Sequence, residues 1–263
     1  MNDKFLEIAI TAAVGGGNIL LQNYGKIIKS SKKESLRDIV TEIDLLSEQE
    51  IVKIILSSND KYGLLTEEQD EIGRLDNSYW IVDALDGTIN YIHQIPLFSV
   101  SVAFIKNEEP VVGAVYNPLS EDLYYGLESI GCFKNQKKLS ITDSPLSSSL
   151  TAAAFSGEAY DKKNRSSEFE LFGRINDLSQ GCLRTGSAAM NLAYVAAGNL
   201  GACWGRANKY WDIAAGLLFA RLSGAVVKYH VVDDTKHLVN YLAATPKCWN
   251  ELEPLIGDVF QLD

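Results

Sequence analysis

The feature that most constrains the fold is a strand-like apolar run that ends in two aspartates, Trp80-Ile-Val-Asp83-Ala-Leu-Asp86. The apolar residues must bury their side chains, so we expect a strand anchored in a sheet, with both carboxylates close together at its end. Two close carboxylates repel each other, and the usual relief is a hard divalent cation bound through oxygen. The run therefore predicts a cation site fixed to the end of a buried strand.

Gly87 and Thr88 follow the second aspartate directly. Gly87 lets the backbone pass close to a ligand, and the next amides can open a helix whose N-terminus favours anions. Metal and phosphate would then meet at one place. The alternative for this run alone is an ordinary strand followed by an Asp-rich turn, because Asp and Gly are common turn residues and the motif is short.

The composition narrows the class of protein. The chain has 263 residues, 46% of them hydrophobic, which suits one large globular domain or two intimate halves. Its net charge of -10 argues against a basic nucleic-acid surface and against attraction to anionic lipid. Four scattered cysteines and three distant histidines argue against a disulfide framework and a zinc site. There is no signal-peptide pattern and no apolar run of spanning length, so the expected location is the cytoplasm.

Apolar periodicity and turn residues predict the elements of secondary structure. We expect helices over residues 4–25, 44–57, 167–178, 186–194, 211–222 and 249–257. We expect strands over residues 79–82, 97–105, 111–116, 122–127, 132–141, 150–155, 200–204, 225–231 and 240–244. Gly113, Asn117-Pro118 and the turn at 134–137 punctuate an antiparallel meander, whereas strands and helices alternate later, which implies a sheet covered by helices. The change near Pro145 suggests halves 1–145 and 146–263 of one catalytic unit.

Acidic residues recur at four positions along the chain, and each has a structural alternative. Asp44 follows Thr41 at the spacing of a helix capping box. Glu67 belongs to an acidic pair that a solvated turn would also explain. Asp212 lies in the first turn of an apolar helix, where a carboxylate is favourable on the helix dipole. The polar segment 30–35, with Lys32 and Lys33, is typical of a mobile loop whose lysines are either solvated or close over a site.

The four positions resemble, in this order and at these separations, the inositol monophosphatase family of magnesium-dependent, lithium-sensitive phosphatases. The segments that carry the resemblance are Asp38-Ile-Val-Thr-Glu-Ile-Asp44, Leu64-Leu-Thr-Glu-Glu68, Asp83-Ala-Leu-Asp-Gly-Thr-Ile-Asn-Tyr91 and Trp211-Asp-Ile-Ala-Ala-Gly216. It covers about residues 4 to 257. The superfamily also includes fructose-1,6-bisphosphatases and 3′-phosphoadenosine-5′-phosphate phosphatases. The resemblance implies a layered α/β/α/β/α sandwich, usually a homodimer, with two or three Mg²⁺ ions in each site.

The resemblance also implies roles for individual residues. Glu67, Asp83 and the Leu85 carbonyl match the ligands of one metal, and Asp83, Asp86 and Asp212 match those of a second. Asp44, Thr88 and the metal-binding Glu67 match the catalytic residues, with Asp44 and Thr88 helping to activate the attacking water. Gly87 and Thr88 match phosphate-binding amides, and Asp86, Gly186, Ser187, Ala188 and Asp212 match positions beside the substrate. Such ions can lower the pKa of a water and clamp a phosphate, so we expect direct attack by water and no phosphoenzyme.

The ending Thr88-Ile-Asn90-Tyr91 resembles the inositol monophosphatase form, which favours an inositol or sugar phosphate over a nucleotide. Inositol-specific members often carry a hydroxyl-binding glutamate seven residues before the position of Asp212, where this chain has Gly205. We expect Gly205 to leave a gap, with Arg206 and Lys209 either solvated beside it or turned inward. The alternatives are a nucleotide 3′-phosphatase, a fructose-1,6-bisphosphatase and a regulatory binding protein without turnover. The acidic balance gives no support to a nucleic-acid partner.

Overall fold

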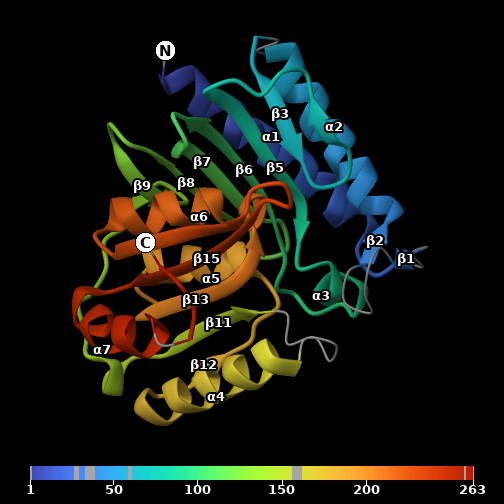
Figure 1. The fold of residues 1–263 in the computed structure, drawn as a ribbon. Helices are drawn as coiled ribbons and strands as arrows, with labels where there is room; N and C mark the ends of the chain where they lie inside the picture. The colour runs from blue at the N-terminus through green and yellow to red at the C-terminus, as the bar shows by residue number, and fades with distance from the viewer. Residues whose placement is uncertain are drawn as a thin grey trace.

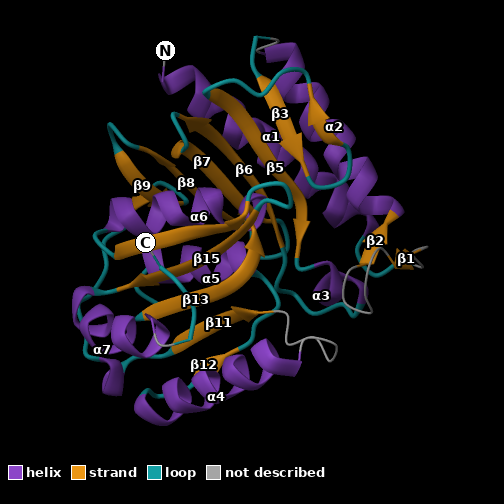
Figure 2. Ribbon diagram, in the orientation of Figure 1, coloured by secondary structure: helices purple, strands orange, loops and turns teal. Residues whose placement is uncertain are grey.

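The computed structural model describes residues 2–26, 30–32, 39–58, 61–155, 162–257 and 259–262 and contains five layers (Figure 1). One outer layer is made of helices α1 (Asn2–Asn23) and α2 (Glu42–Ser58). The middle layer, between the two large sheets, is made of α5 (Ala188–Ala196) and α6 (Tyr210–Ser223). The other outer layer is made of α4 (Lys162–Leu178) and α7 (Pro246–Gly257), as Figure 2 shows by element type. The predicted α/β/α/β/α sandwich is confirmed.

The first sheet lies between the α1–α2 layer and the α5–α6 layer. Its order is β10-β9-β8-β7-β6-β5-β3-β4. The strands are β3 (Gly63–Thr66), β4 (Asp70–Ile72), β5 (Ser78–Asp86), β6 (Ser99–Lys106), β7 (Glu109–Asn117), β8 (Asp122–Leu127), β9 (Gly131–Lys134) and β10 (Lys137–Lys138). From β5 to β10 each strand pairs antiparallel with the next, as the predicted meander requires. Gly113 does not separate strands, however, because it lies inside β7 where α6 packs on the sheet.

Strand β5 continues beyond the predicted end at residue 82 and includes both aspartates. Asp83 pairs with Ser101 and Asp86 pairs with Ser99, so two residues of β5 lie opposite Val100 alone. This extra residue is a β-bulge. Side chains three residues apart on a regular strand point to opposite faces, but the bulge brings Asp83 and Asp86 to the same face.

The second sheet has the order β12-β11-β13-β15-β14. Its strands are β11 (Thr151–Phe155), β12 (Cys182–Leu183), β13 (Ala202–Lys209), β14 (Val226–Asp233) and β15 (Leu238–Ala244), and the 3-10 turn η1 (Leu146–Ser148) precedes them. β11 is parallel to β12 and β13, and β15 is antiparallel to β13 and β14. β1 (Ser30–Lys32) pairs antiparallel with β2 (Ile39–Thr41), so part of the predicted loop is a strand. Lys33 to Asp38 lie outside the described residues.

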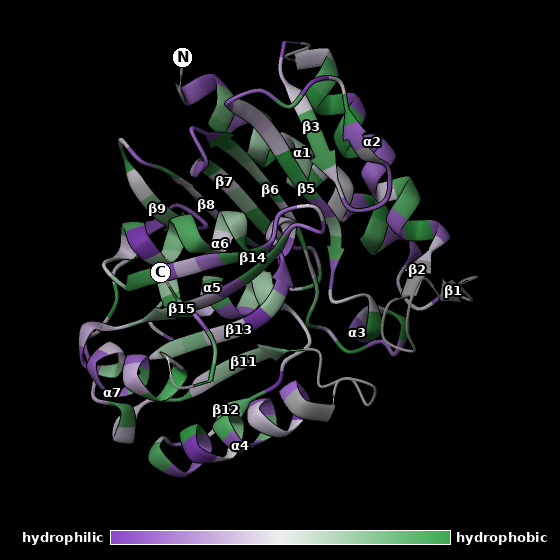
Figure 3. Ribbon diagram, in the orientation of Figure 1, coloured by the Kyte–Doolittle hydropathy of each residue, from purple (hydrophilic) through white to green (hydrophobic). Residues whose placement is uncertain are grey.

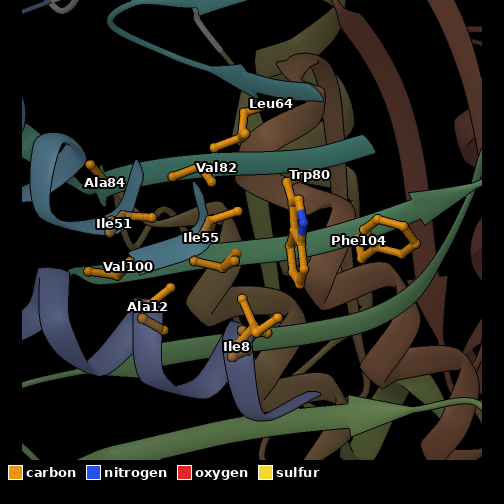
Figure 4. Close-up of a cluster of buried hydrophobic side chains, with 14 of the residues drawn as sticks. Ile8, Ala12, Ile51, Ile55, Leu64, Trp80, Val82, Ala84, Val100 and Phe104 are labelled. Atoms are coloured by element: carbon orange, nitrogen blue, oxygen red, sulfur yellow. The ribbon is translucent and has the colours of Figure 1, made fainter. Parts of the chain in front are cut away.

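The core of the outer half packs α1 and α2 against the first sheet (Figure 4). Ile8 of α1 and Ile55 of α2 lie on the face of the sheet that carries Trp80, which is fully buried and 5.0 Å from the Phe104 ring. Figure 3 shows the corresponding hydrophobic colour along β6 and β7. Burial of one such large side chain stabilises the fold by about 1.5–3 kcal/mol, so this cluster fixes the direction of β5 and with it the position of Asp83.

Helix α1 is long and apolar enough over Asp3–Asn23 to cross a membrane by length and composition, contrary to the prediction that no run reaches spanning length. In the fold its apolar face is buried. Phe5, Ile8 and Leu20 belong to the core, and its glycines allow close approach, with Gly16 facing Ile51 of α2. A core helix that packs on both a sheet and another helix satisfies the same length and composition test.

Candidate active site

Three carboxylates from distant parts of the sequence meet at one end of the first sheet. Side-chain oxygens of Glu67, Asp83 and Asp212 all lie within 4.8 Å of one another. Asp83 is buried, and this burial, followed by the charges of Glu67, Asp212 and Asp86, raises the pKa of Asp83 well above its ordinary value. Repulsion of this kind is relieved by a proton or by a cation bound between the oxygens.

The strand pairing explains why these three residues meet. β3 lies parallel to β5 with Thr66 opposite Val82, so the residues that follow them, Glu67 and Asp83, lie at the same end of the sheet. The Ser101 hydroxyl of β6 donates to the carbonyl of Trp211 at 3.2 Å and holds the start of α6, with Asp212, at that end. The donor set is made of oxygens from carboxylates, which suits a hard cation and does not suit a soft one. The residues present therefore fit the metal that the sequence predicts.

Asp44 and Thr88 form a second pair beside this cluster. The Asp44 carboxylate accepts hydrogen bonds from the Thr41 amide at 2.9 Å and from the Thr41 hydroxyl, and the Asp44 amide donates back to the Thr41 hydroxyl oxygen. This is the capping box that the sequence allows. The Thr88 hydroxyl, however, also donates to the same carboxylate at 3.3 Å. Asp44 thus combines capping of α2 with a contact to the site. Burial raises the pKa of Asp44 to about 6.

The turn between β5 and the short helix α3 (Thr88–Ile92) depends on Gly87. Its φ of 95° and ψ of 36° are left-handed, a conformation that glycine adopts at little cost. A Cβ at this position would also lie 3.1 Å from the carbonyl oxygen of Leu97. The predicted helix therefore begins at Thr88, whose hydroxyl lies 3.1 Å from the carbonyl oxygen of Leu85. Leu85, Gly87 and Thr88 are consequently neighbours around one turn.

Asp86 joins the two halves of the chain. Its carboxylate accepts hydrogen bonds from the amides of Ala188 at 3.2 Å and Ala189 at 2.9 Å and from the Ser187 hydroxyl. Ser187 also caps α5 by accepting from the amide of Met190. Burial raises the pKa of Asp86 to about 6 although these hydrogen bonds lower it. A carboxylate has about four lone-pair sites, so Asp86 keeps capacity for a further ligand.

The turn before α5 is fixed to the α3 turn by Asn90. Its side-chain amide donates to the carbonyls of Leu97 at 2.7 Å and Thr185 at 2.8 Å. Gly186, which follows Thr185, packs directly against this side chain. The structure therefore brings the predicted substrate-side residues Gly186, Ser187 and Ala188 to the same place as Asp86.

Glu48 is a site residue that the sequence reasoning missed. Its carboxylate is fully buried and accepts a hydrogen bond from the backbone amide of Glu68 at 2.9 Å, next to Glu67. Burial raises the pKa of Glu48. A signal was present, because Glu48 lies one helical turn after Asp44 on the face that also carries Ser47 and Ile51. A charged residue on the buried face of a helix is unusual, so its place in the helical pattern marks Glu48 as a candidate site residue.

The prediction that Gly205 leaves a gap is wrong. The space where a side chain would stand is filled by the ring of Tyr241 and the side-chain oxygen of Asn208. Arg206 is not simply solvated, because it forms an ion pair with the buried Glu168 at 3.0 Å. The Lys209 ammonium donates to the carbonyl of Lys236 and lies over the ring of Trp211. The register of β13 with β15, which the sequence alone does not reveal, explains the difference.

Comparison with known sequences decides the family. The model of the group described as the inositol monophosphatase family matches residues 1–252. The chain belongs to the inositol monophosphatase family. The family consists of phosphatases that depend on metal, and the acidic cluster of this chain can hold a metal ion.

Individual relatives align with most of the length of this chain. It is 35% identical to an inositol-1-monophosphatase of Synechocystis sp. over 85% of this chain and 78% of the relative. It is 34% identical to the Nus factor SuhB of Haemophilus influenzae over 98% of this chain and 99% of the relative. The crystal structure of the extragenic suppressor protein suhB from Bartonella henselae matches with a TM-score of 0.88 at 28% identity, covering 97% of this chain and 99% of that one.

Proposed function

We propose that this chain is a Mg²⁺-dependent phosphomonoesterase that hydrolyses inositol monophosphate or a similar small polyol or sugar phosphate. The observation that carries the proposal is the convergence of Glu67, Asp83 and Asp212 beside the Asp44–Thr88 pair. A relative named inositol-1-monophosphatase supports the substrate class. A binding module has no need to bury carboxylates that repel one another, so the arrangement favours turnover.

Glu67, Asp83 and Asp212, with the Leu85 carbonyl and Asp86 beside them, are the residues that would hold two or three Mg²⁺ ions. Bound Mg²⁺ supplies Lewis acidity, which lowers the pKa of water and neutralises charge on the phosphate. Asp83 offers two carboxylate oxygens, one of which accepts from the Leu85 amide at 2.8 Å. That hydrogen bond fixes the orientation of the Asp83 carboxylate, which would be a ligand of the metal.

Thr88 and Asp44 are placed to orient the attacking water. The Thr88 hydroxyl donates its proton toward Asp44, which leaves its oxygen lone pairs to accept from water. The water gives up one proton as its oxygen forms a bond to phosphorus. The bond from phosphorus to the alcohol oxygen breaks with its electron pair going to that oxygen, which takes up one proton, so the products are the free alcohol and inorganic phosphate. The amides of Gly87 and Thr88 are proposed to hold the phosphate. Ser187 and Ala188 would lie beside the alcohol.

We propose that the halves 1–145 and 146–263 work as one catalytic unit. The carboxylate of Asp86 in the first half accepts hydrogen bonds from the start of α5 in the second half, so the site needs residues from both. We also propose a homodimer inhibited by lithium, as the resemblance implies. Exposed apolar side chains at α4 and the edge strand β12, including Leu178 and Leu183, are available to such a contact. Light scattering at micromolar concentration distinguishes a dimer from a monomer.

Phosphate release from a panel of substrates tests the proposed activity. Inositol phosphates, fructose-1,6-bisphosphate, histidinol phosphate, NADP and 3′-phosphoadenosine-5′-phosphate are compared at equal concentration, with Mg²⁺ and with EDTA. We expect inositol or sugar monophosphates to be cleaved in Mg²⁺ only. A preference for the adenosine bisphosphate or for fructose-1,6-bisphosphate would establish the corresponding alternative, and phosphate release in EDTA would contradict the metal role.

The relatives named Nus factor SuhB support a regulatory role as a second candidate function. The Asp83→Asn variant separates the two functions, because it removes a metal ligand and keeps the shape of the side chain. A Nus-factor role that survives in this variant is independent of catalysis. A role that disappears together with phosphate release depends on the metal site.

A further inference from the structure

Tyr241 lies across Gly205 in the second sheet. The two residues are paired between β15 and β13, and a Cβ at position 205 would overlap the Tyr241 ring, with the ring carbon that bears the hydroxyl at 2.8 Å. Gly205 therefore makes room for the ring. Tyr241 is fully buried in a cluster with Ala188 and Ile213, the residues that directly follow Ser187 and Asp212.

The hydroxyl of Tyr241 is buried and has no hydrogen-bond partner among the described residues. Burial raises the pKa of Tyr241 above its ordinary value, and the charges of Cys203, Asp86 and Asp212 contribute in the same direction. A buried tyrosine hydroxyl normally finds a partner, and leaving it without one costs folding free energy. A buried group of this kind at a site calls for a ligand.

Asn208 is brought to the same point by an irregularity in β13. The register shifts between Gly205 and Asn208, so Arg206 and Ala207 lie opposite Asn240 alone. Ala207 has a left-handed φ of 51°, and its amide donates to the side chain of Asn240 at 3.0 Å. Bulges re-aim side chains beside active sites. This one places the Asn208 side-chain oxygen over Gly205, where it too is buried and has no partner in the described part of the chain.

We propose that Tyr241 and Asn208 form an uncharged subsite that binds an alcohol hydroxyl of the substrate. A hydroxyl group both accepts and donates, so it complements a phenol donor and an amide carbonyl acceptor placed side by side. The subsite rests on the proposed phosphatase function and deepens it: it selects phosphates of polyols and sugars over phosphates of alcohols without further hydroxyls. Tyr241 acts on substrate selection and takes no part in the attack on phosphorus.

The test compares Tyr241→Phe with wild type on inositol 1-phosphate and on p-nitrophenyl phosphate, which has no alcohol hydroxyl. We expect kcat/KM for inositol 1-phosphate to fall about tenfold, mainly through KM, as for loss of one buried hydrogen bond. Activity on p-nitrophenyl phosphate should stay within about twofold of wild type, and the Tm of the ligand-free variant should not fall. Tyr125→Phe, which removes a phenol that stacks on Phe133 at β8, is the control. Asn208→Leu should reproduce the selective loss.

Equal losses on both substrates, or a lower Tm for Tyr241→Phe, would assign Tyr241 a structural role and overturn the subsite. Unchanged kinetics on both substrates would overturn it as well. If wild type cleaves p-nitrophenyl phosphate but not inositol 1-phosphate or a sugar phosphate, the subsite is refuted while phosphatase chemistry stands. If wild type releases phosphate from neither compound in Mg²⁺, the proposed function is refuted together with the subsite.

Discussion

Asp83→Asn should make the metal-free protein more stable and the enzyme inactive. The variant keeps the shape of the side chain and an oxygen that can accept from the Leu85 amide, but it removes the charge that Glu67 and Asp212 repel. At the 4.8 Å limit of the cluster, each pair of carboxylates repels by about 3.5 kcal/mol for an effective dielectric constant near 20. Proton uptake relieves part of this in wild type, so we expect a net gain of about 1–3 kcal/mol.

For a chain of this length the gain corresponds to a rise in Tm of roughly 2–10 °C in EDTA. In saturating Mg²⁺ wild type should have the higher Tm, because Mg²⁺ binding stabilises wild type and the variant has lost a metal ligand. Thermal melts of both proteins in EDTA and in Mg²⁺, with phosphate release measured on the same samples, test the reasoning. Asp177→Asn, the same change at an exposed position on α4, is the control. A lower Tm for Asp83→Asn in EDTA, or retention of most Mg²⁺-dependent activity, would refute it.

Three further outcomes follow from the geometry. Thr88→Ala should lower kcat about 100-fold with little change in KM, whereas Asp44→Ala should lose activity and, through its cap, about 1 kcal/mol of stability; an active Asp44→Ala would leave capping as its sole role. Because burial raises the pKa of Asp44 and Asp86 to about 6, above the ordinary 3.8, the folded chain keeps protons that the unfolded chain has lost. Urea unfolding in EDTA should therefore show higher stability at pH 5 than at pH 7.5, and the opposite order would contradict these shifts. Gly205→Ala should lower Tm by several degrees, because its Cβ would overlap the Tyr241 ring, whereas an unchanged Tm would show that the ring does not need the space.

Much of the fold could be predicted because its elements have strong local patterns. The apolar alternation of the strands from β6 to β8 and the glycine that ends α6 were sufficient to place those elements within a few residues. The start of α3 could be predicted from Gly87 and Thr88, although its five residues are too few for a period to give its end. β12 was missed, because two residues show no period at all. The extension of β5 to Asp86 was missed because it depends on pairing with Ser99, a contact between strands.

The same distinction between local motifs and contacts between strands separates the site residues that could be predicted from those that could not. Asp44, Asp83 and Asp212 could be named because each stands in a local motif. Tyr241 and Asn208 could not, because their place over Gly205 depends on the register between two strands and on a bulge. The expected gap was wrong for that reason: removing a side chain from one strand opens space only if no neighbour on the next strand fills it.

The bulge in β5 has a consequence for how such a site can change over time. Asp83 and Asp86 share a face only because Ala84 and Leu85 together face Val100. With two residues between the aspartates, a regular pleat would point them to opposite faces, so a change of pairing with β6 that removed the bulge at constant length would turn one carboxylate away. With one residue or three between them, a regular pleat would keep both carboxylates on one face without a bulge. Substitutions that weaken the pairing of Asp86 with Ser99 should therefore cost the site even in a chain that keeps both aspartates and their spacing.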